Sequence, residues 1–147
     1  MYRFQYSVWT NASRSLAWEV FSDWHRWNSF ADVYGERRWL EGKPWTIGSR
    51  MQIEVLRPVE TMVDHLIISC EPAQEIGWID RACGITLGQW VRFEQVGTEK
   101  TRIKTWGEIA PSGVHLAGRA VEQIVSTFIE TWYENFRGEC DQLAGAA

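Results

Sequence analysis

The sequence has few of the residues from which metal sites and disulfide frameworks are built. It contains three cysteines, Cys70, Cys83 and Cys140, and three histidines among 147 residues. The cysteines are odd in number and widely spaced, and no CxxC, HxH or HxxxH pattern occurs. Neither a zinc site nor a disulfide framework is therefore expected. We expect no metal, no cofactor and a location in the reducing cytoplasm.

Long apolar runs and clusters of positive charge are also missing. No apolar stretch approaches the length of a membrane span, and residues 1–5 lack the apolar core of a secretory signal. The formal net charge is −4, and Arg37-Arg38 is a pair rather than a basic stripe. Because a negative chain does not attract phosphate backbones, nucleic-acid binding is not expected.

Tryptophan, in contrast, is abundant, with ten residues in the chain. The apolar fraction of 45% is ordinary for a globular protein. The length suits one domain, residues 1–147, with one core. Large flat side chains either fill a core or form the walls of a cavity or contact surface, and composition alone does not separate these roles.

The N-terminal part of the chain predicts one strand followed by two short helices. Residues 3–10 alternate aromatic and polar side chains, as a strand does. A first helix is expected over Ser15–Phe21, with Ser13 among the residues that could cap it. A second is expected over Trp24–Asn28, capped by Asp23. Both are too short to be stable alone and must lie on something larger.

From residue 33 to residue 109 the hydrophobic pattern has a period of two. It predicts six strands separated by short turns: Tyr34–Leu40, Ser49–Leu56, Thr61–Cys70, Glu75–Asp80, Thr86–Gln95 and Thr101–Ile109. Such short connections permit only antiparallel neighbours, and a strongly twisted sheet of this size curls.

After Pro111-Ser112-Gly113 the pattern becomes helical and continues to about Leu143. One apolar stripe runs along this segment: Val114, Ala117, Val121, Ile124, Val125, Phe128, Trp132, Phe136, Cys140 and Leu143. A helix with so long a stripe needs an equally long trough, which a curled sheet supplies. The space between sheet and helix is either filled by side chains or forms a ligand cavity.

The stretch Ser13–Trp27 (SRSLAWEVFSDWHRW) resembles the VWxxxSDxxxW opening of the START-like superfamily, also called SRPBCC or helix-grip proteins. The likeness is to its polyketide cyclase/dehydrase and lipid-transport branch. The segments Ile47-Gly48-Ser49, Cys70-Glu71-Pro72 and Val96-Gly97-Thr98 follow in the order typical of that superfamily, and the resemblance spans nearly the whole chain.

The resemblance implies an α+β helix-grip fold, with a curved antiparallel sheet of about seven strands around a long C-terminal helix and two short helices after the first strand. Its shared residues look structural: Trp18 packs a helix on the sheet, Asp23 caps, and Gly48 and Gly97 form turns. Members bind lipids, polyketides, hormones or quinone-like molecules, and only some are catalysts, so the fold alone does not imply a reaction.

Strand alternation predicts which side chains face the cavity. In residues 61–70 the set Met62, Asp64, Leu66, Ile68 and Cys70 is apolar at four of five positions, so it is expected inside. This places Asp64 inside and His65 outside. The same argument turns the following residues inward: Met51, Ile53, Val55, Ile76, Trp78, Leu87, Gln89, Val91, Phe93, Ile103, Thr105, Gly107 and Ile109. Asp80 is expected near the rim.

An apolar trough with a few polar positions is typical of a selective small-molecule pocket. The expected ligand-binding residues are Trp27, Phe30, Met51, Ile53, Asp64, Leu66, Trp78, Gln89, Val91, Thr105, Ile124, Phe128 and Trp132. For Asp64, a pocket position, a rim position and an error in the assigned strand parity remain open, and Gln89 and Thr105 can serve either a ligand or the structure. The aromatic cluster Trp24–Phe30, with His25, is either a gate over the mouth or the packing of a lid.

Three functions fit this reading. The first is a non-catalytic binder of a lipid, a polyketide-like ring system or an isoprenoid or quinone-like molecule. The second is a polyketide aromatase/cyclase or dehydratase, in which Asp64 with Tyr34 or with an arginine of Arg37-Arg38 forms the acid–base pair. The third is a protein-interaction or chaperone-assisting module. Trp90 and Trp106, expected on the outer face, favour a surface contact such as a homodimer.

Overall fold

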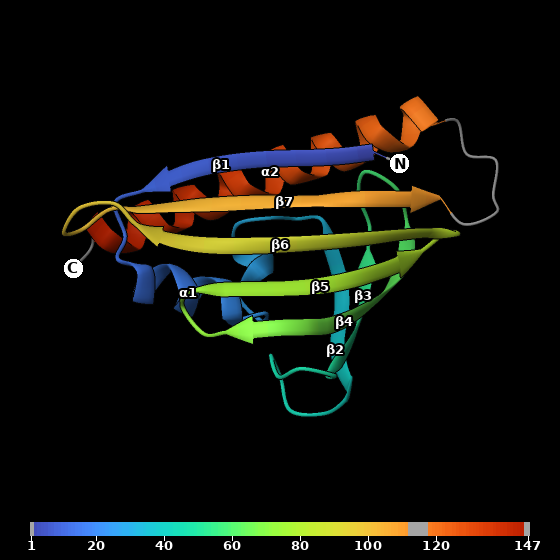
Figure 1. Cartoon of the computed structure of the whole chain (residues 1–147), viewed down its shortest axis with the longest axis horizontal. Coiled ribbons are helices and arrows are strands. Elements are labelled where there is room, and N and C mark those ends of the chain that lie inside the picture. The colour runs from blue at the N-terminus through green and yellow to red at the C-terminus, as the bar shows by residue number, and fades with distance from the viewer. Residues whose placement is uncertain (1, 112–117, 146–147) are drawn as a thin grey trace.

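The computed structural model describes residues 2–111 and 118–145. Their strands form one antiparallel sheet in the order β1-β7-β6-β5-β4-β3-β2 (Figure 1). The strand bounds are β1 Tyr2–Thr10, β2 Tyr34–Glu41, β3 Arg50–Val55, β4 Thr61–Glu71, β5 Glu75–Ala82, β6 Ile85–Gln95 and β7 Thr101–Pro111. The chain returns to β1 only after six hairpin-linked strands, when β7 pairs with it along its whole length.

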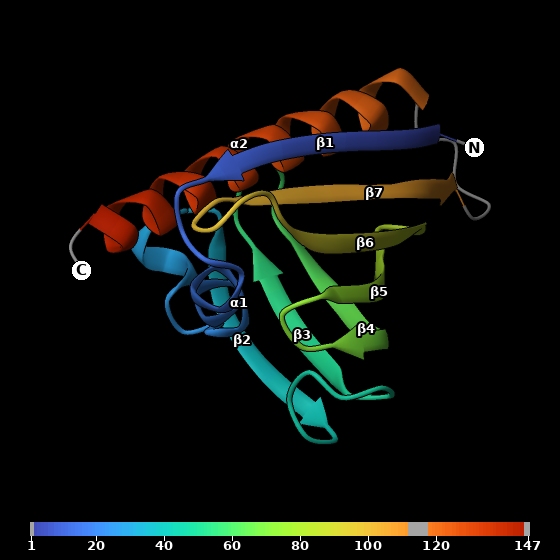
Figure 2. The ribbon, with the colours of Figure 1, turned by 60° about the vertical axis from the view of Figure 1, so that its left-hand side comes forward.

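The long helix α2, Gly118–Gly145, lies across the concave side of this sheet. In Figure 2 the half formed by β2, β3 and β4 turns away from β1 and β7, so that the sheet bends around the space below the helix. The predicted helix-grip fold, with seven strands and a long C-terminal helix, is confirmed. The expected start of the helical stripe, Val114 and Ala117, lies outside the described residues.

The short helix α1, Arg14–Ser22, begins where the sequence predicts, with the Ser13 side chain accepting a hydrogen bond from the Leu16 N–H at 3.1 Å. Its Trp18 ring meets Phe93 of β6 edge-on at 5.7 Å, which packs the helix on the sheet. The second short helix is shorter than expected. It is the single 3-10 turn η1, Trp27–Ser29, and Asp23 ends α1 through its backbone N–H instead of capping a new helix.

Strand β4 contains a bulge that reverses the alternation on which the sequence analysis relied. Ile67 pairs with Trp78 and Ser69 with Gly77, so Ile68 is an extra residue with no partner of its own. Before the bulge the inward side chains are Thr61, Val63, His65 and Ile67, and after it Cys70 faces the core.

The predicted orientation of Asp64 and His65 is therefore wrong. His65 is 5% exposed and faces inward, whereas Asp64 lies on the outer face. There the Asp64 carboxylate accepts hydrogen bonds from the Arg50 guanidinium at 3.2 and 3.0 Å. When the alternation is counted back from Cys70 and Ile68, it assigns Leu66 and the residues before it to the wrong face. The inserted residue moves every earlier side chain of the strand to the opposite face.

The packed core is concentrated at the end of the molecule that holds α1 and η1. The Phe21 ring lies 5.6 to 6.0 Å from the rings of Trp78, Phe93, Trp132 and Phe136, measured between centroids. The Trp27 indole N–H donates to the Phe21 carbonyl oxygen at 2.9 Å, which fixes η1 against α1. Of the two readings of the Trp24–Phe30 cluster, packing fits Trp27, which is buried, and Phe30, whose ring lies on those of Trp132 and Phe136.

Trp90 and Trp106 lie on the outer face, as predicted, and pair across β6 and β7. Trp90 covers Gly77, where an added Cβ would lie 2.5 Å from the indole. The Arg92 guanidinium carbon and the Lys104 ammonium nitrogen, from the neighbouring cross-strand pair, lie 5.3 and 5.7 Å from the centroid of the Trp106 ring. Both indoles thus have partners within the chain.

Within residues 2–111 and 118–145, neither helix is sufficiently long and apolar to cross a bilayer. The same residues contain no group of three His, Cys, Asp or Glu side chains arranged to hold a metal ion.

Candidate functional site

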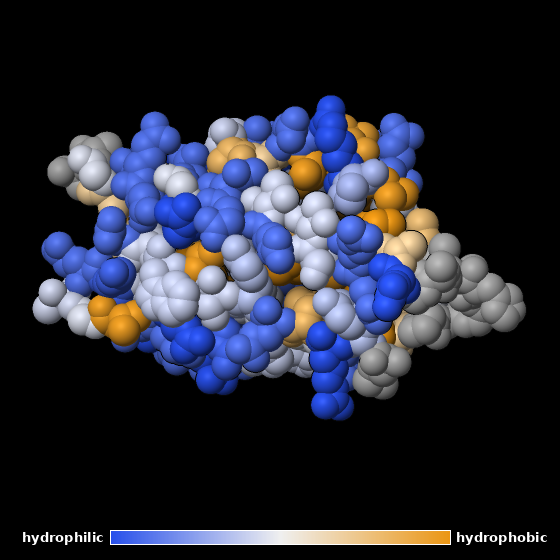
Figure 3. All heavy atoms as spheres, turned by 90° about the horizontal axis from the view of Figure 1, so that it is seen from above, coloured by the Kyte–Doolittle hydropathy of each residue, from blue (hydrophilic) through white to orange (hydrophobic). Residues whose placement is uncertain are grey.

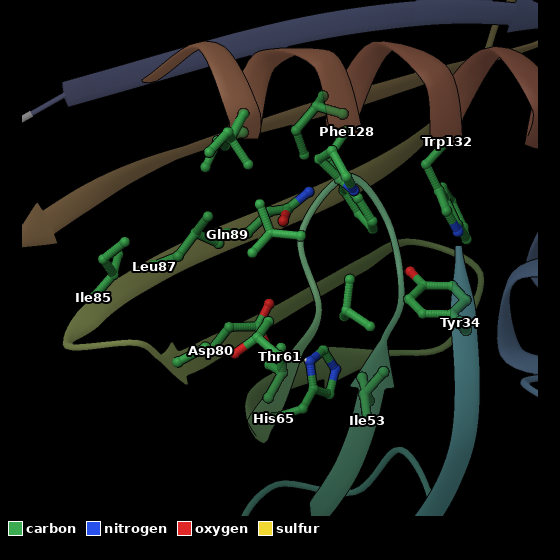
Figure 4. Close-up of a pocket in the computed structure, with 18 of the residues that line it drawn as sticks. Tyr34, Ile53, Thr61, His65, Asp80, Ile85, Leu87, Gln89, Phe128 and Trp132 are labelled. Atoms are coloured by element: carbon green, nitrogen blue, oxygen red, sulfur yellow. Dashed lines mark hydrogen bonds and ion pairs between the residues drawn. The ribbon is translucent and has the colours of Figure 1, made fainter. Parts of the chain in front are cut away.

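A cavity of about 350 Å³ lies between α2 and the concave face of β3, β4, β5 and β6 (Figure 4). Its described lining residues are mostly aromatic and aliphatic: Phe21, Trp27, Tyr34, Trp45, Ile53, Val55, Pro58, Val59, Thr61, Val63, His65, Trp78, Asp80, Ala82, Cys83, Ile85, Leu87, Gln89, Ala120, Val121, Ile124, Val125, Phe128, Ile129, Trp132 and Tyr133. The volume lies near the lower end of the ~300–1,000 Å³ typical of small-molecule pockets.

The two ends of this cavity differ in exposure. Its inner end is closed by Phe21, Trp27 and Trp45, of which the first two are buried. At the other end the lining residues Val59 and Ile124 are 44% and 38% exposed. Figure 3 shows hydrophobic side chains among hydrophilic ones on the surface where α2 begins. Among the described residues, the open end thus lies where the β3–β4 and β5–β6 turns meet the first turns of α2.

His65 and Asp80 form a hydrogen-bonded pair on the cavity wall. The His65 Nδ1 lies 2.5 Å from Asp80 Oδ1, and Asp80 Oδ2 accepts a hydrogen bond from the Trp78 indole N–H at 3.0 Å. Because a carboxylate only accepts, the His65 Nδ1 carries the proton. The other ring nitrogen, Nε2, is buried and has no hydrogen-bond partner in the described part of the chain.

A second buried nitrogen without a partner among the described residues is the indole Nε1 of Trp132. Trp132 is 4% exposed and projects from α2 into the same cavity. Tyr34 of β2 also lines the cavity, and in Figure 4 its hydroxyl is turned toward the space between helix and sheet. Buried polar atoms without a partner are rare in folded proteins, so two on one cavity wall are notable.

Gln89 is held in one orientation by a chain of hydrogen bonds. The Thr105 hydroxyl donates to the Trp90 carbonyl oxygen at 2.9 Å, so it accepts the Gln89 Nε2–H at 2.8 Å. The same Nε2 also donates to the Tyr133 hydroxyl at 3.2 Å. The amide nitrogen is thereby committed to the wall, and the amide oxygen of Gln89 is left as an acceptor at the cavity (Figure 4).

The two tyrosines of the cavity are kept in the phenol form. Burial raises the pKa of Tyr34 well above its usual value, and the neighbouring Tyr133 and Asp80 raise it further. Burial likewise raises the pKa of Tyr133, although its hydrogen bonds with Thr105 and Gln89 oppose the effect. Removing a phenol proton inside this apolar space would create a desolvated anion.

Seven of the predicted ligand-binding residues line the cavity: Trp27, Ile53, Trp78, Gln89, Ile124, Phe128 and Trp132. Tyr34, expected as an acid–base group, lines it as well. Met51 and Val91 are instead fully buried core residues, and Thr105 lies behind Gln89 as its hydrogen-bond acceptor. Whether any of these side chains contacts a ligand stays a prediction.

Phe30, Asp64 and Leu66 lie outside this lining. Phe30 packs on Trp132 and Phe136, at 5.7 and 6.1 Å between ring centroids. Asp64 and Leu66 face outward because of the bulge. The structure therefore separates Asp64 from Tyr34, the two residues expected to act together.

Sequence reasoning missed His65, Tyr133 and Trp45, and it placed Asp80 at the rim. The alternation of Thr61, Val63, His65 and Ile67 contains a signal for His65, but the longer apolar set on the opposite parity outweighed it. Trp45 lies in the loop between β2 and β3 at a φ of 63°, and its indole N–H donates to the Ser22 carbonyl oxygen at 2.8 Å. No periodic pattern reveals such a residue.

No protein-family model and no curated protein matches the sequence. The fold, however, matches solved structures along nearly the whole chain. A START superfamily protein from Mycobacterium smegmatis aligns with a TM-score of 0.78 at 14% identity, over 96% of this chain and 98% of its own. The Zhui aromatase/cyclase from Streptomyces sp. R1128 aligns with a TM-score of 0.83 at 15% identity, over 96% and 94%.

A third similar structure is the protein Ara h 8.0201, with a TM-score of 0.79 at 11% identity, over 95% of this chain and 97% of that one. At such low identity the likeness concerns the fold and leaves the chemistry of the cavity to be argued from its own residues.

Proposed function

The chain has the START-like, or helix-grip, fold, and from the cavity inside that fold we propose that it binds a small hydrophobic or amphipathic molecule between the sheet and α2. The single observation that carries this proposal is the cavity of about 350 Å³, walled by aromatic and aliphatic side chains with a few polar groups directed into it. A small apolar pocket with convergent polar groups is the usual form of a ligand site.

The aromatic walls favour a ligand with flat rings. Trp78 of β5 and Phe128 and Trp132 of α2 line the space, and rings packed offset or edge-to-face on such side chains gain more than their buried area alone provides. The volume suits a molecule of a few fused rings or a short isoprenoid better than a phospholipid with two acyl chains. A polyketide-like or quinone-like ring system fits this description best.

The test is binding of a neutral naphthyl dye, N-phenyl-1-naphthylamine, followed by its emission and by quenching of tryptophan emission. We expect saturable binding to the wild-type protein. Leu87→Trp places a large side chain inside the cavity and should abolish it. Met62→Trp adds the same side chain on the outer face of β4, where Met62 is 48% exposed, and should leave binding unchanged.

Equal dye binding by wild type, Leu87→Trp and Met62→Trp would place the dye outside the cavity and refute the proposal. Circular dichroism and thermal unfolding establish that each variant is folded. Native mass spectrometry of freshly purified protein then looks for a ligand retained from the cell.

A second function, catalysis, is favoured by the His65–Asp80 pair. A histidine held by a carboxylate, with its second nitrogen buried in the wall of an apolar cavity, has the arrangement of a general base. An aromatase/cyclase or dehydratase acting on a polyketide-like chain would use it to remove a proton beside a carbonyl group, with the Tyr34 phenol near the carbonyl oxygen. Incubation of a poly-β-ketone substrate with wild type and with His65→Gln tests this: only the wild type should accelerate cyclisation.

A further inference from the structure

Three polar groups on residues that line the cavity have a defined hydrogen-bonding sense. The Nε2 of His65 lacks a hydrogen on the neutral imidazole, because Nδ1 donates to Asp80, and so it accepts. The Gln89 amide oxygen also accepts, since its amide nitrogen is committed to Thr105 and Tyr133. The Trp132 indole Nε1–H can only donate.

Two of these groups are buried without a partner in the described residues, which distinguishes them from ordinary core polar atoms. His65 is 5% exposed and Trp132 is 4% exposed, and neither Nε2 nor Nε1 finds a protein partner there. A buried polar atom without a hydrogen bond destabilises the folded protein, and a ligand that supplies the missing partner recovers that loss on binding.

The charge of the wall restricts the ligand further. Among the described lining residues there is no lysine or arginine, and Asp80 is the one carboxylate. The Arg37 guanidinium lies 5.5 Å from the centroid of the Tyr34 ring and donates to the backbone oxygens of Trp24 and Gly35. An anionic ligand would be desolvated in the cavity without a cation to pair with, beside the Asp80 carboxylate.

We propose that the ligand of this cavity is an uncharged hydroxylated ring molecule, rather than a fatty acid or a phosphorylated lipid. Its hydroxyl groups donate to His65 Nε2 and to the Gln89 amide oxygen, and an oxygen on its other side accepts the Trp132 indole N–H. Tyr34, kept as a phenol, adds a group that can donate or accept. This inference rests on the proposed function and specifies the chemical class that the same site takes.

Three probes with one ring system test it: naphthalene, 2-naphthol and 2-naphthoate, each measured by displacement of N-phenyl-1-naphthylamine. We expect 2-naphthol to bind more tightly than naphthalene by about tenfold to a hundredfold, as a hydrogen bond to an otherwise unpaired buried group implies. The carboxylate should bind most weakly of the three.

The variants assign the preference to individual atoms. Gln89→Met and His65→Leu remove the two acceptors and should reduce the ratio of 2-naphthol to naphthalene affinity toward one. Trp132→Phe removes the donor, keeps an aromatic ring, and should weaken 2-naphthol alone. Asp64→Asn, on the outer face of the same strand as His65, is the matched control and should leave the ratio unchanged. Because each protein is judged by a ratio, partial destabilisation affects both probes alike.

The outcomes separate this inference from the proposed function. Equal binding of naphthalene and 2-naphthol, or tightest binding of 2-naphthoate, overturns the inference while the cavity remains a ligand site. A 2-naphthol preference that survives Gln89→Met, His65→Leu and Trp132→Phe overturns it as well. Failure of the dye and of all three probes to bind overturns both.

Discussion

The Nδ1 of His65 on β4 lies 2.5 Å from the Asp80 carboxylate on β5, and the two residues are direct partners across the strands. Asp80 also accepts from the Trp78 indole, so its two oxygens hold two donors in place. One carboxylate thereby determines which nitrogen of the histidine carries the proton and which has the free lone pair.

Asp80→Asn is expected to reverse the tautomer of His65. The Asn oxygen would accept from Trp78 and its amide would donate to Nδ1, which moves the imidazole proton to Nε2. Nitrogen-15 chemical shifts of the imidazole should show this exchange, and the variant should have a smaller preference for 2-naphthol over naphthalene, because the Gln89 acceptor remains. Asp64→Asn is the control. A His65 that keeps its proton on Nδ1 in Asp80→Asn would contradict the role assigned to Asp80.

The long helix is expected to divide into a packed part and a cavity-lining part. Phe136 is fully buried and contacts Trp132, Phe21 and Phe30, at 5.3 to 6.1 Å between ring centroids. Phe136→Ala should lower the free energy of unfolding by about 3–5 kcal/mol. Ile124 is 38% exposed at the open end, so Ile124→Ala should cost less and should change dye affinity.

Urea unfolding and dye titration of the same two variants check this division. If Ile124→Ala proves as destabilising as Phe136→Ala and leaves dye affinity unchanged, the first turns of α2 are plain core and do not line a ligand site.

Much of this architecture could be predicted from periodicity alone. The strands and α2 follow regular patterns of two and of three to four residues, and every predicted strand overlaps an observed one. The inward set on β3, Met51, Ile53 and Val55, is also confirmed, because no irregularity interrupts that strand between its paired residues.

The residues of the site were harder to predict from the sequence than the strands and helices, because a bulge leaves no mark in the sequence pattern. The single inserted residue at Ile68 exchanges the faces of β4, and nothing in its side chain distinguishes it from a regular strand residue. The error moved Asp64 into the cavity and His65 out of it. Trp45 and Tyr133 contribute through a loop and through the flank of the helical stripe, positions that alternation does not specify.

Cys83 provides a direct report on occupation of the cavity. It is exposed and lines the open end, whereas burial raises the pKa of the Cys70 thiol and raises that of Cys140 to about 12. Because the thiolate is the reactive form, Cys83 should react first with Ellman's reagent at neutral pH. Saturating dye should slow this reaction, and Cys83→Ser should remove the fast phase. A fast phase that dye leaves unchanged would place the bound dye away from this end.

Alkaline pH should destabilise the protein through its two cavity tyrosines. Their pKa values are raised by burial, so the folded protein retains the phenol protons that the unfolded chain releases near pH 10. The unfolded state then binds fewer protons, and stability falls as the pH rises above about 10. Urea midpoints measured across this range should fall less steeply in Tyr34→Phe and in Tyr133→Phe. An unchanged slope in both variants would contradict the assignment.

Trp45 is expected to set the length of the ligand. Its indole closes the inner end of the cavity beside Phe21 and Trp27, and it is held at a positive φ of 63° by a loop. Trp45→Gly removes the side chain and relieves the backbone, because glycine adopts positive φ without a steric penalty. The variant should favour 4-alkylphenols with longer chains than the wild type does, measured by dye displacement.

Trp39 packs on Trp45 at 5.2 Å but does not line the cavity, so Trp39→Ala is the control that loses an aromatic contact without lengthening the space. If Trp45→Gly and wild type prefer the same chain length, the cavity ends before Trp45, and the aromatic cluster around Phe21 is its true inner wall.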